Sequence, residues 1–304
     1  GRANEAIDSL GAPVVVKASG LAAGKGVIVC HTVDEARAAA ASMLEDGAFG
    51  PAGETILIEE FMTGEELSVF ALTDGESAVL LPPAQDHKRL LDGDRGPNTG
   101  GMGAYCPVSL VDERPELLDI VVNDIVNPTL DAMRSRGTPF TGLLYVGLMV
   151  TCDGPKVVEF NCRFGDPEAQ AVLPALGANA PLSELMYTIA RGGTMAEEGV
   201  LATERCAVTT VLAARGYPES PITGDAIRLS SSPDTLVFHA GTKRDASGRL
   251  VTGGGRVLAV TGLGDTIADA RDRSRSLADS IDFAGKQRRT DIASRELMRR
   301  AGAS

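Results

Sequence analysis

The sequence predicts a mixed α+β protein with at least two domains. Its 304 residues exceed the roughly 100–200 residues of one ordinary domain. Hydrophobic residues make up 43% of the chain and charged residues 23%, which is a globular composition and excludes general disorder. Short runs of β-branched residues are interspersed with helical stretches. Together these observations predict strands and helices that share hydrophobic cores.

The first 66 residues predict a small α+β domain. Gly11 ends a first amphipathic helix, and Thr32 is placed to cap a later, alanine-rich one. Between them, two short apolar runs flank a glycine-rich segment, which predicts a hairpin. The expected elements are helices over 4–10 and 32–45 and strands over 14–17, 27–29 and 56–61.

Residues 67–190 predict a second and larger domain. The turns Asp74-Gly75 and Asp153-Gly154 each lie between two apolar runs, which is typical of β-hairpins. The polar stretch 85–103, QDHKRLLDGDRGPNTGGMG, predicts a functional or mobile loop. The expected elements are strands over 66–73, 78–81, 143–151 and 156–160 and helices over 115–136 and 182–190.

A third domain is expected over residues 191–304, after the boundary at Arg191-Gly192-Gly193. Its first part consists of short apolar runs, and a longer amphipathic stretch follows them. The expected elements are strands over 206–214, 236–241, 249–252 and 257–261 and a helix over 266–281.

Charge and composition exclude several classes of partner. The net charge of −12, the 4% of aromatic residues and the absence of tryptophan disfavour a nucleic-acid partner. No run approaches the about 18 apolar residues of a membrane span, so no membrane partner is expected. The five cysteines form no C-x-x-C pair and are odd in number, which favours reduced thiols and a cytoplasmic location. The chain opens inside a helix without an initiator methionine, and we interpret it as a fragment or a processed chain.

A glycine-rich loop between two strands predicts a phosphate cradle. Gly20, Gly24 and Gly26 would let backbone N–H groups approach an anion, and Lys25 would add a positive charge. The spacing fits neither a P-loop nor a dinucleotide fingerprint, because a strand follows instead of a helix. Lys17 ends a buried strand, where a bound phosphate would compensate its charge. The alternatives are a flexible hairpin tip and a lysine whose head reaches solvent.

A carboxylate strand provides the candidate metal site. Glu159 and Asn161 are two residues apart on one strand, so they project to one face, while Val158 and Phe160 are expected on the other. Carboxylate and amide oxygens suit Mg²⁺, which takes few protein ligands beside substrate phosphates. Arg163 could bind a transferring phosphoryl group or a substrate carboxylate. The alternative is a strand that ends in a polar turn.

Two further segments carry polar residues with an open interpretation. Glu59-Glu60-Phe61-Met62 ends a strand in a way that could hold an adenine and a ribose, or could be an ordinary acidic turn. The stretch 85–103 gathers charged residues beside Asn98-Thr99-Gly100-Gly101, and the alternative there is a solvated loop.

In combination, these segments resemble an ATP-grasp ligase and, more narrowly, the glycinamide ribonucleotide synthetase (phosphoribosylamine–glycine ligase) family of purine biosynthesis. The resemblance covers the chain from about residue 10 to its end. The stretches that carry it are KASGLAAGKGVIV at 17–29, IEEFMTGEELS at 58–68, QDHKR at 85–89, GPNTGGMGAY at 96–105, EFNCRFGDPE at 159–168, HAGTK at 239–243 and TGGGRVL at 252–258.

The resemblance implies an ATP-grasp fold with a small lobe over 1–66 and a large lobe over 67–190. A small mixed α/β C-terminal domain over 191–304 follows. It also implies that ATP phosphorylates glycine to glycyl phosphate and that the amine of 5-phosphoribosylamine attacks this intermediate. The implied cofactors are ATP and Mg²⁺, with Mn²⁺ as a substitute.

On this basis the expected site residues fall into four groups. The catalytic residues are Arg163 and Lys25, and the metal ligands are Glu159 and Asn161. The ATP-binding residues are Lys17, Gly24, Lys25, Gly26, Glu59, Glu60, Phe61, Met62 and Glu66. The substrate-binding residues are Asp86, His87, Lys88, Asn98, Thr99, Gly100, Gly101, Arg163 and Asp166.

Two departures from the family pattern qualify this expectation. The N-terminal domain that helps bind the phosphoribosyl group is absent from the chain, so we expect the chain by itself to be slow or inactive. The strand expected over 143–151 contains no acid, which argues against two fully protein-bound metals. The competing hypotheses are another ATP-grasp carboxylate–amine ligase and a nucleotide-binding fragment without turnover.

Overall fold

The computed structural model describes residues 1–20, 26–196 and 199–302, so the predicted site residues Gly24 and Lys25 lie outside the described part. Its contacts divide the chain into two compact units. The first comprises Gly1–Thr63 and Asn98–Gly100, and the second comprises Gly64–Pro97 and Gly101–Ser304. The predicted domain boundaries near residues 66 and 190 stay predictions.

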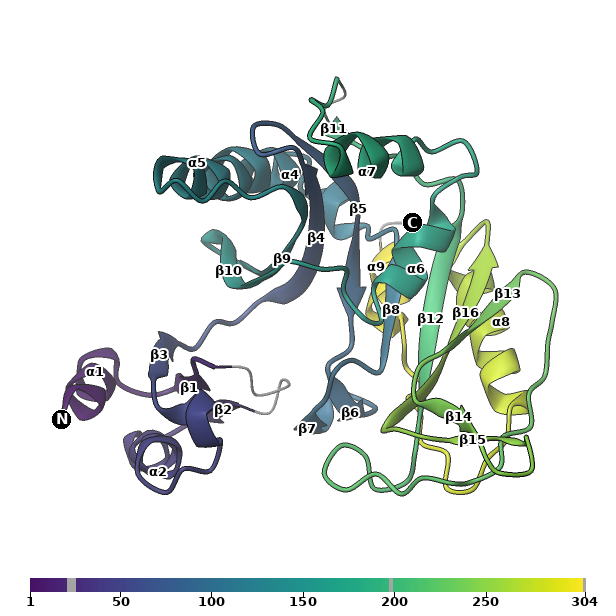
Figure 1. Ribbon diagram of the computed structural model, residues 1–304, viewed down its shortest axis with the longest axis horizontal. Coiled ribbons are helices and arrows are strands. Elements are labelled where there is room, and N and C mark those ends of the chain that lie inside the picture. The colour runs from purple at the N-terminus through teal and green to yellow at the C-terminus, as the bar shows by residue number, and fades with distance from the viewer. Residues whose placement is uncertain (21–25, 197–198, 303–304) are drawn as a thin grey trace. The chain divides into compact units, whose positions relative to one another are not determined.

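The first unit is a three-stranded antiparallel sheet with two helices, drawn in purple and dark blue in Figure 1. Its apolar core includes Ile7, Val14, Val16 and Met43, all at most 1% exposed. Thr32 caps the second helix as predicted, because its hydroxyl accepts a hydrogen bond from the Glu35 N–H at 3.2 Å. The elements are α1 (Arg2–Leu10), β1 (Val14–Ala18), β2 (Val27–Cys30), α2 (Val33–Leu44), the 3₁₀ turn η1 (Gly50–Gly53) and β3 (Ile56–Glu60), with sheet order β2-β1-β3.

The second unit is built on one large sheet, which has nine strands among the described residues. Eight of them follow the order β10-β9-β4-β5-β8-β12-β16-β13, and β11 pairs with β5. The strands are β4 (Glu65–Thr73), β5 (Ala78–Asp86), β8 (Gly103–Cys106), β9 (Gly142–Thr151), β10 (Gly154–Asn161), β11 (Gly199–Val200), β12 (Cys206–Ala213), β13 (Thr235–His239) and β16 (Arg256–Gly264).

Helices cover both faces of this sheet (Figure 1). On one face, the continuous helical segment formed by α4, η2 and α5 packs on Val69, Val146 and Leu148; on the other, α6 and α7 pack on Phe70 and Tyr145. The helices are α3 (Leu110–Glu113), α4 (Leu117–Ile120), the π-helical turn η2 (Val121–Val126), α5 (Asn127–Ser135), α6 (Ala169–Ala175), α7 (Leu182–Ala190), α8 (Ile267–Ser280) and α9 (Ser294–Gly302).

The expected loop over 85–103 contains more regular structure than its polar sequence indicates. Strand β5 continues to Asp86, a small hairpin is formed by β6 (Arg89–Leu91) and β7 (Arg95–Asn98), and β8 begins at Gly103. The expectation of an irregular loop was therefore wrong for much of this stretch. β8 pairs with β12, about 100 residues later in the chain, and a partner this remote leaves no local signal.

The structure differs from the predicted elements in three further ways. A β-bulge at Val158 lets one residue of β9 face two of β10, so Val157, and not Val158, shares a face with Phe160. Helices α6 and α9 were not predicted from the sequence. A second hairpin, β14 (Thr242–Arg244) with β15 (Leu250–Thr252), lies beside the strands of the C-terminal part.

Among the described residues, no helix is both long enough and apolar enough to cross a membrane.

Candidate functional site

The register of the large sheet places the predicted metal ligands on one face. Glu159 pairs with Gly147, which pairs with Ser68 on the next strand; Asn161 pairs with Tyr145 in the same way. Paired residues share a face, so both ligands project to the face that carries Ser68 and Tyr145. We call this face, with Glu66, Ser68, Asp86, Lys88, Tyr145, Glu159, Asn161 and Glu168, the polar face.

Gly147 leaves room beside the Glu159 side chain. A Cβ atom at position 147 would lie 3.3 Å from Glu159 Cγ and 3.1 Å from Tyr145 Cε1, which is tight for both neighbours. A strand position directly opposite a carboxylate normally carries a side chain that touches it. The glycine therefore lets the Tyr145 ring and the Glu159 side chain lie close to the strand at this point.

Glu159 and Asn161 fit a magnesium site in which the protein supplies only two of the ligands. The Glu159 side chain is exposed and that of Asn161 is half-buried, so both oxygens can reach a bound ion. Among the described residues, no cluster holds three or more His, Cys, Asp or Glu side chains suited to a metal. Mg²⁺ needs no such cluster, since it commonly keeps waters and uses one or two protein oxygens beside phosphates.

A charged cluster occupies the same face at the end of β5. Lys88 Nζ lies 2.8 Å from Glu66 Oε2, and both side chains are about one-third exposed. Burial raises the pKa of Asp86, the neighbouring carboxylates of Glu168 and Glu66 raise it further, and Lys88 opposes the change. Burial alone would lower the pKa of Lys88, but the carboxylates of Asp86 and Glu66 outweigh it and hold this pKa well above its usual range. The structure thus groups Glu66, predicted to bind ATP, with two residues predicted to bind substrate.

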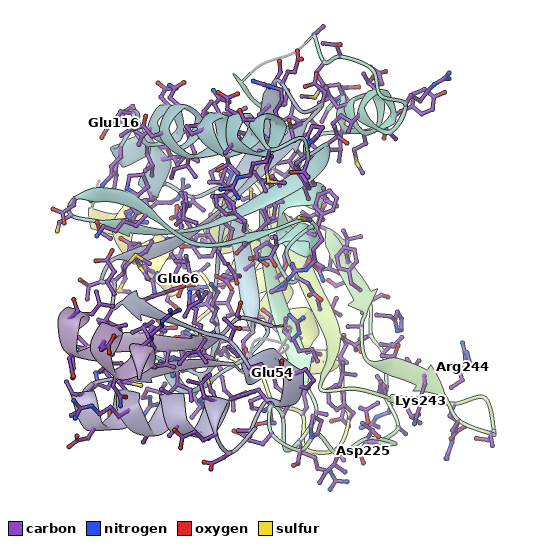
Figure 2. The ribbon with its side chains drawn as sticks, turned by 60° about the vertical axis from the view of Figure 1, so that its left-hand side comes forward. Glu54, Glu66, Glu116, Asp225, Lys243 and Arg244 are labelled. Carbon is purple, nitrogen blue, oxygen red and sulfur yellow. The ribbon has the colours of Figure 1, made fainter. Side chains whose placement is uncertain are left out.

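The exposed cations Lys243 and Arg244, on the β14–β15 hairpin, do not belong to the polar face. Figure 2 shows Glu66 apart from both of them.

Glu168 is a member of this site that sequence reasoning missed. Its side chain is 4% exposed, and its Oε1 accepts hydrogen bonds from the hydroxyls of Ser68 at 3.0 Å and Tyr145 at 3.3 Å. The two hydroxyls lie 3.0 Å from each other. A buried carboxylate is rare unless it is compensated, so an acid that directly follows the turn at Asp166-Pro167 was the available signal.

Arg163 and Asp166 lie on the segment that leaves β10. Both side chains are exposed, and Arg163 Nη1 donates to the carbonyl oxygen of Phe164 at 2.8 Å. Arg256, which was not predicted as a site residue, donates to the Asp166 carbonyl at 2.6 Å and to its Oδ2 at 3.0 Å. Gly101 packs against the same turn: its φ is +110°, and a Cβ there would lie 2.4 Å from Pro167 Cδ. The turn is therefore held from both β16 and the segment that precedes β8.

His87 projects away from Asp86 and Lys88. Its side chain is 5% exposed and lies among residues of the opposite face, where its Nε2 accepts a hydrogen bond from the Ala293 N–H at 3.2 Å. The structure thus gives the imidazole an internal partner and keeps it off the polar face. Asn98, Thr99 and Gly100, the other predicted substrate-binding residues, belong to the first unit and are exposed or half-buried.

Within the first unit, Lys17 has a carboxylate partner. Its Nζ lies 2.5 Å from Glu59 Oε2 across the β1–β3 pair, with side chains 16% and 33% exposed. Glu59 thus compensates the charge at the strand end, where the sequence predicts a bound phosphate to do so. Glu60 is exposed at the end of β3, Met62 is half-buried, and the Phe61 ring lies 6.2 Å from that of His31.

The glycine-rich loop is described only at its ends. Gly20 packs on η1, since its N–H donates to the Ala52 carbonyl at 3.0 Å and a Cβ would lie 2.5 Å from Ala52 Cα. Gly26 is buried, and its carbonyl accepts from the Ala18 N–H at 2.7 Å. At Gly20 the glycine is therefore required by packing against Ala52.

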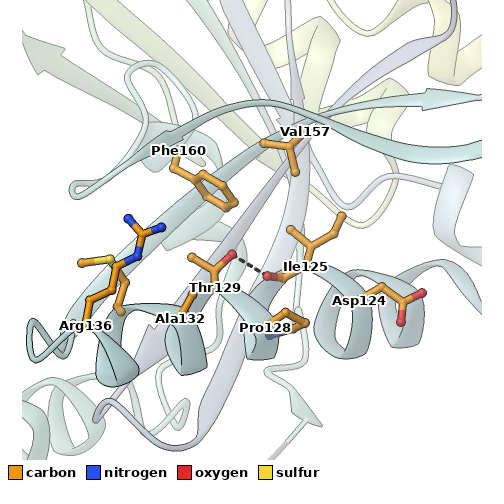
Figure 3. A pocket seen from close by; sticks show the side chains of 9 residues that line it. Asp124, Ile125, Pro128, Thr129, Ala132, Arg136, Val157 and Phe160 are labelled. Atoms are coloured by element: carbon orange, nitrogen blue, oxygen red, sulfur yellow. Dashed lines mark hydrogen bonds between the residues drawn. The ribbon is translucent and has the colours of Figure 1, made fainter.

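A hollow of about 460 Å³ opens on the opposite face of β10 from the predicted metal ligands. Val157 and Phe160 line it from the strand, and residues of η2 and α5 line it from below, including Ile125, whose carbonyl accepts from the Thr129 hydroxyl (Figure 3). Its lining is mostly apolar. The hollow therefore does not coincide with the predicted site.

Comparison with known proteins identifies close relatives over nearly the whole chain. The family models for the ATP-grasp (A) domain and the C domain of phosphoribosylglycinamide synthetase match residues 1–169 and 207–295. The chain is 46% identical to the phosphoribosylamine–glycine ligase of Caulobacter vibrioides, over 97% of this chain and 68% of that protein. It is 45% identical to the human trifunctional purine biosynthetic protein adenosine-3, over 93% of this chain and 28% of that protein.

Solved structures agree with these relatives. The crystal structure of phosphoribosylamine–glycine ligase from Thermotoga maritima matches with a TM-score of 0.83 and 36% identity, over 95% of this chain and 71% of that one. A biotin carboxylase domain from Hydrogenobacter thermophilus matches with a TM-score of 0.67 and 16% identity, over 94% of this chain and 60% of that one, which shows a shared fold. The expected ATP-grasp fold is confirmed by these similarities.

Proposed function

This chain belongs to the phosphoribosylglycinamide synthetase family, and we propose that it contributes to the ATP-dependent ligation of glycine to 5-phosphoribosylamine, a step of purine biosynthesis. Glycine's carboxylate oxygen attacks the γ-phosphorus of ATP and releases ADP. The amine then attacks the acyl carbon of glycyl phosphate, phosphate leaves, and the new amide bond gives glycinamide ribonucleotide with loss of one proton. No side-chain nucleophile is required.

One observation carries this proposal: a single face of the sheet presents both an oxygen-ligand pair and a cluster of partly buried charges. Glu159 and Asn161 end β10, and Glu66, Asp86 and Lys88 gather at β4 and the end of β5, on the same face. Phosphoryl transfer depends mainly on positioning and on compensation of charge, which such a face can provide.

Within this scheme Asp86, on the polar face, binds the nitrogen end of the substrates. It accepts hydrogen bonds from an ammonium or amine group, and Lys88, the other substrate-binding residue here, balances the charge of Asp86 and Glu66. Arg163, which is exposed and follows Glu159 and Asn161 along the chain, supplies a guanidinium for the transferring phosphoryl group. Asn98, Thr99, Gly100, Gly101 and Asp166 complete the proposed substrate-binding set.

The first unit contributes the nucleotide-binding residues of the proposal. The ion pair of Lys17 with Glu59 holds the lysine head at the end of β1, where it can exchange its partner for a phosphate. Lys25, Gly24 and Gly26 belong to the proposed phosphate loop, and Glu59 to Met62 to the proposed nucleoside contacts; Glu66, in the second unit, is also proposed to bind ATP. Lys25 is also proposed as a catalytic cation.

Glu159 and Asn161 would hold Mg²⁺, or Mn²⁺ in its place. When bound, such an ion compensates the charge of the triphosphate and orients its terminal phosphate. The chain's own contribution is to keep the two oxygens on one face and, by the glycine at 147, to leave the Glu159 side chain its present position. We also propose a cytoplasmic location, consistent with the free thiols of all five cysteines, which lie in the described part of the chain.

Trapping of the acyl phosphate with hydroxylamine tests this function. We expect glycine hydroxamate to form only when glycine, ATP and Mg²⁺ are all present, with one ADP per hydroxamate. Alanine and β-alanine in place of glycine serve as controls for substrate class. ATP binding without hydroxamate formation would contradict turnover by this chain and favour the hypothesis of a nucleotide-binding fragment.

A further inference from the structure

The backbone of His87, which directly follows β5, is fixed by hydrogen bonds to the start of β8 and the residue before it. Its N–H donates to the Gly103 carbonyl at 2.9 Å, and its carbonyl accepts from the Met102 N–H at 2.7 Å. These bonds extend the β5–β8 ladder, in which Asp86 pairs with Ala104. Because side chains alternate along a strand, Asp86 and Lys88 point to the polar face while His87 points to the opposite one.

On that opposite face, His87 bonds to a segment that lies 206 residues later in the chain. Its Nε2 accepts from the Ala293 N–H at 3.2 Å, which places the imidazole proton on Nδ1, 3.9 Å from Asp94 Oδ1. Burial lowers the pKa of His87, against the opposing effect of Asp94, so the neutral ring required for this bond is favoured. The other charged and aromatic groups around the ring are Arg289, Asp291 and Tyr105.

The partner of His87 is a backbone group in an uncommon conformation. Ala293 is fully buried and has a φ of +62°, in the left-handed region that non-glycine residues rarely adopt. A buried N–H without a partner is strongly disfavoured, and the ring nitrogen is the group that satisfies this one. The bond therefore stabilises a strained turn that immediately precedes α9.

The surrounding ion pairs extend the same connection. Arg289 is 1% exposed and binds Asp94 Oδ1 at 2.7 Å and Asp291 Oδ2 at 2.7 Å. The Thr290 N–H donates to Asp92 Oδ1 at 2.7 Å. The β6–β7 hairpin that follows Lys88 is thus bound to the same C-terminal segment that His87 contacts. Residues 86–88 are held on one side by this segment and on the other by β8.

We propose that His87 is a positioning residue, which fixes Asp86 and Lys88 on the polar face by binding the backbone of the C-terminal segment at Ala293. This inference rests on the proposed function, in which Asp86 and Lys88 bind the glycine end of the reaction. Loss of the acceptor at position 87 releases residues 86–88 and weakens glycine binding. The nucleotide-binding residues of the first unit are not involved.

Two substitutions separate the acceptor from the side-chain volume. His87→Gln keeps an acceptor, since its amide oxygen reaches about as far as Nε2, whereas His87→Leu removes it. The same two substitutions at His239, an exposed histidine outside the site, are the matched controls. We expect His87→Leu to raise the KM for glycine at least tenfold in the hydroxamate assay and to change the KM for MgATP less than twofold. His87→Gln is expected to stay within threefold of the unsubstituted chain for both.

Amide hydrogen exchange provides a readout that does not depend on turnover. In His87→Leu, exchange at Ala293 and at residues 86–88 is expected to accelerate at least tenfold, with His87→Gln close to the unsubstituted chain.

Each of three results would overturn the inference. They are equal KM values for His87→Leu and the unsubstituted chain, equal impairment of both variants, and unchanged exchange at residues 86–88. If the unsubstituted chain forms no hydroxamate, the proposed function fails, and the exchange rates alone decide whether His87 holds residues 86–88. Should His87→Leu not fold, His87→Asn, whose amide is too short to reach Ala293, replaces it with the same expectations.

Discussion

The two faces of strands β10, β9 and β4 differ in the chemistry of the side chains that they carry. One face carries Leu67, Val146 and Leu148, each at most 1% exposed and packed under the helical segment of α4, η2 and α5. The other carries the hydroxyl and carboxylate groups of the polar face. Successive residues of one strand therefore serve separate purposes. The comparison teaches that one sheet can use one face mainly for packing and the other for both packing and polar contacts.

The difference predicts distinct consequences of substitution. On the face under α4, η2 and α5, removed atoms leave a cavity and the free energy of unfolding falls. On the polar face, the removed groups contribute little apolar burial, so function should change more than stability. Three substitutions test this division, in order of decreasing expected effect.

Leu148→Ala tests the face under α4, η2 and α5. We expect the free energy of unfolding to fall by about 2–5 kcal/mol, the usual range for a buried leucine, with KM values unchanged in the protein that remains folded. Urea denaturation measures the change. Val157→Ala, at a partly exposed position on the same face, should cost less than about 1.5 kcal/mol. Equal losses at the two positions would contradict the importance of burial here.

Glu159→Ala tests the polar face directly. Loss of one of two proposed metal ligands should lower the rate of hydroxamate formation about 100-fold at saturating glycine, equivalent to about 2.7 kcal/mol of activation free energy. The concentration of Mg²⁺ needed for half-maximal rate should rise as well. Thermal melts should show little loss of stability, because the side chain is exposed. An unchanged magnesium dependence would remove Glu159 from the site.

Gly147→Ala asks whether space on the polar face matters. The added methyl group would press on Glu159 Cγ and on the Tyr145 ring, at 3.3 and 3.1 Å. We expect about a tenfold loss of rate, or about 1.4 kcal/mol, with the effect confined to steps that need Mg²⁺. Gly154→Ala, in the β9–β10 turn, is the control for an effect of glycine replacement on the hairpin itself. A Cβ at position 154 would meet open space. The φ of +112° at this position makes alanine strained, so this control reports the backbone effect alone. Identical magnesium profiles for Gly147→Ala and the unsubstituted chain would contradict a role for this space.

Much of the fold could be predicted from local patterns. The turn residues Asp74-Gly75 and Asp153-Gly154 predicted two hairpins, and the structure confirms both through the β4–β5 and β10–β9 pairs. Thr32 predicted the start of α2, and the apolar period predicted α7 over its observed bounds. The shared face of Glu159 and Asn161 is also confirmed, because strand alternation resumes after the bulge at Val158. These features depend on neighbours in the chain.

Features that depend on remote neighbours could not be predicted. Glu168 became part of the site only when Ser68 and Tyr145, 100 and 23 residues away, enclosed it. His87 was grouped with Asp86 and Lys88 by its place in the sequence, yet its ring faces the segment around Ala293. Arg256 contacts Asp166 across 90 residues.

By itself, the sequence determined the α+β composition, the strand carrying Glu159 and Asn161, and the family to which the chain belongs. Propensities, turn residues and alternation act over a few positions, and a motif is a local arrangement of residue types. Only the tertiary structure decided which charges compensate one another: Lys17 with Glu59, Lys88 with Glu66, and the buried Glu168 with two hydroxyls. The physical reason is that burial and pairing depend on closeness in space. The register of the sheet brings together residues that lie far apart in the chain.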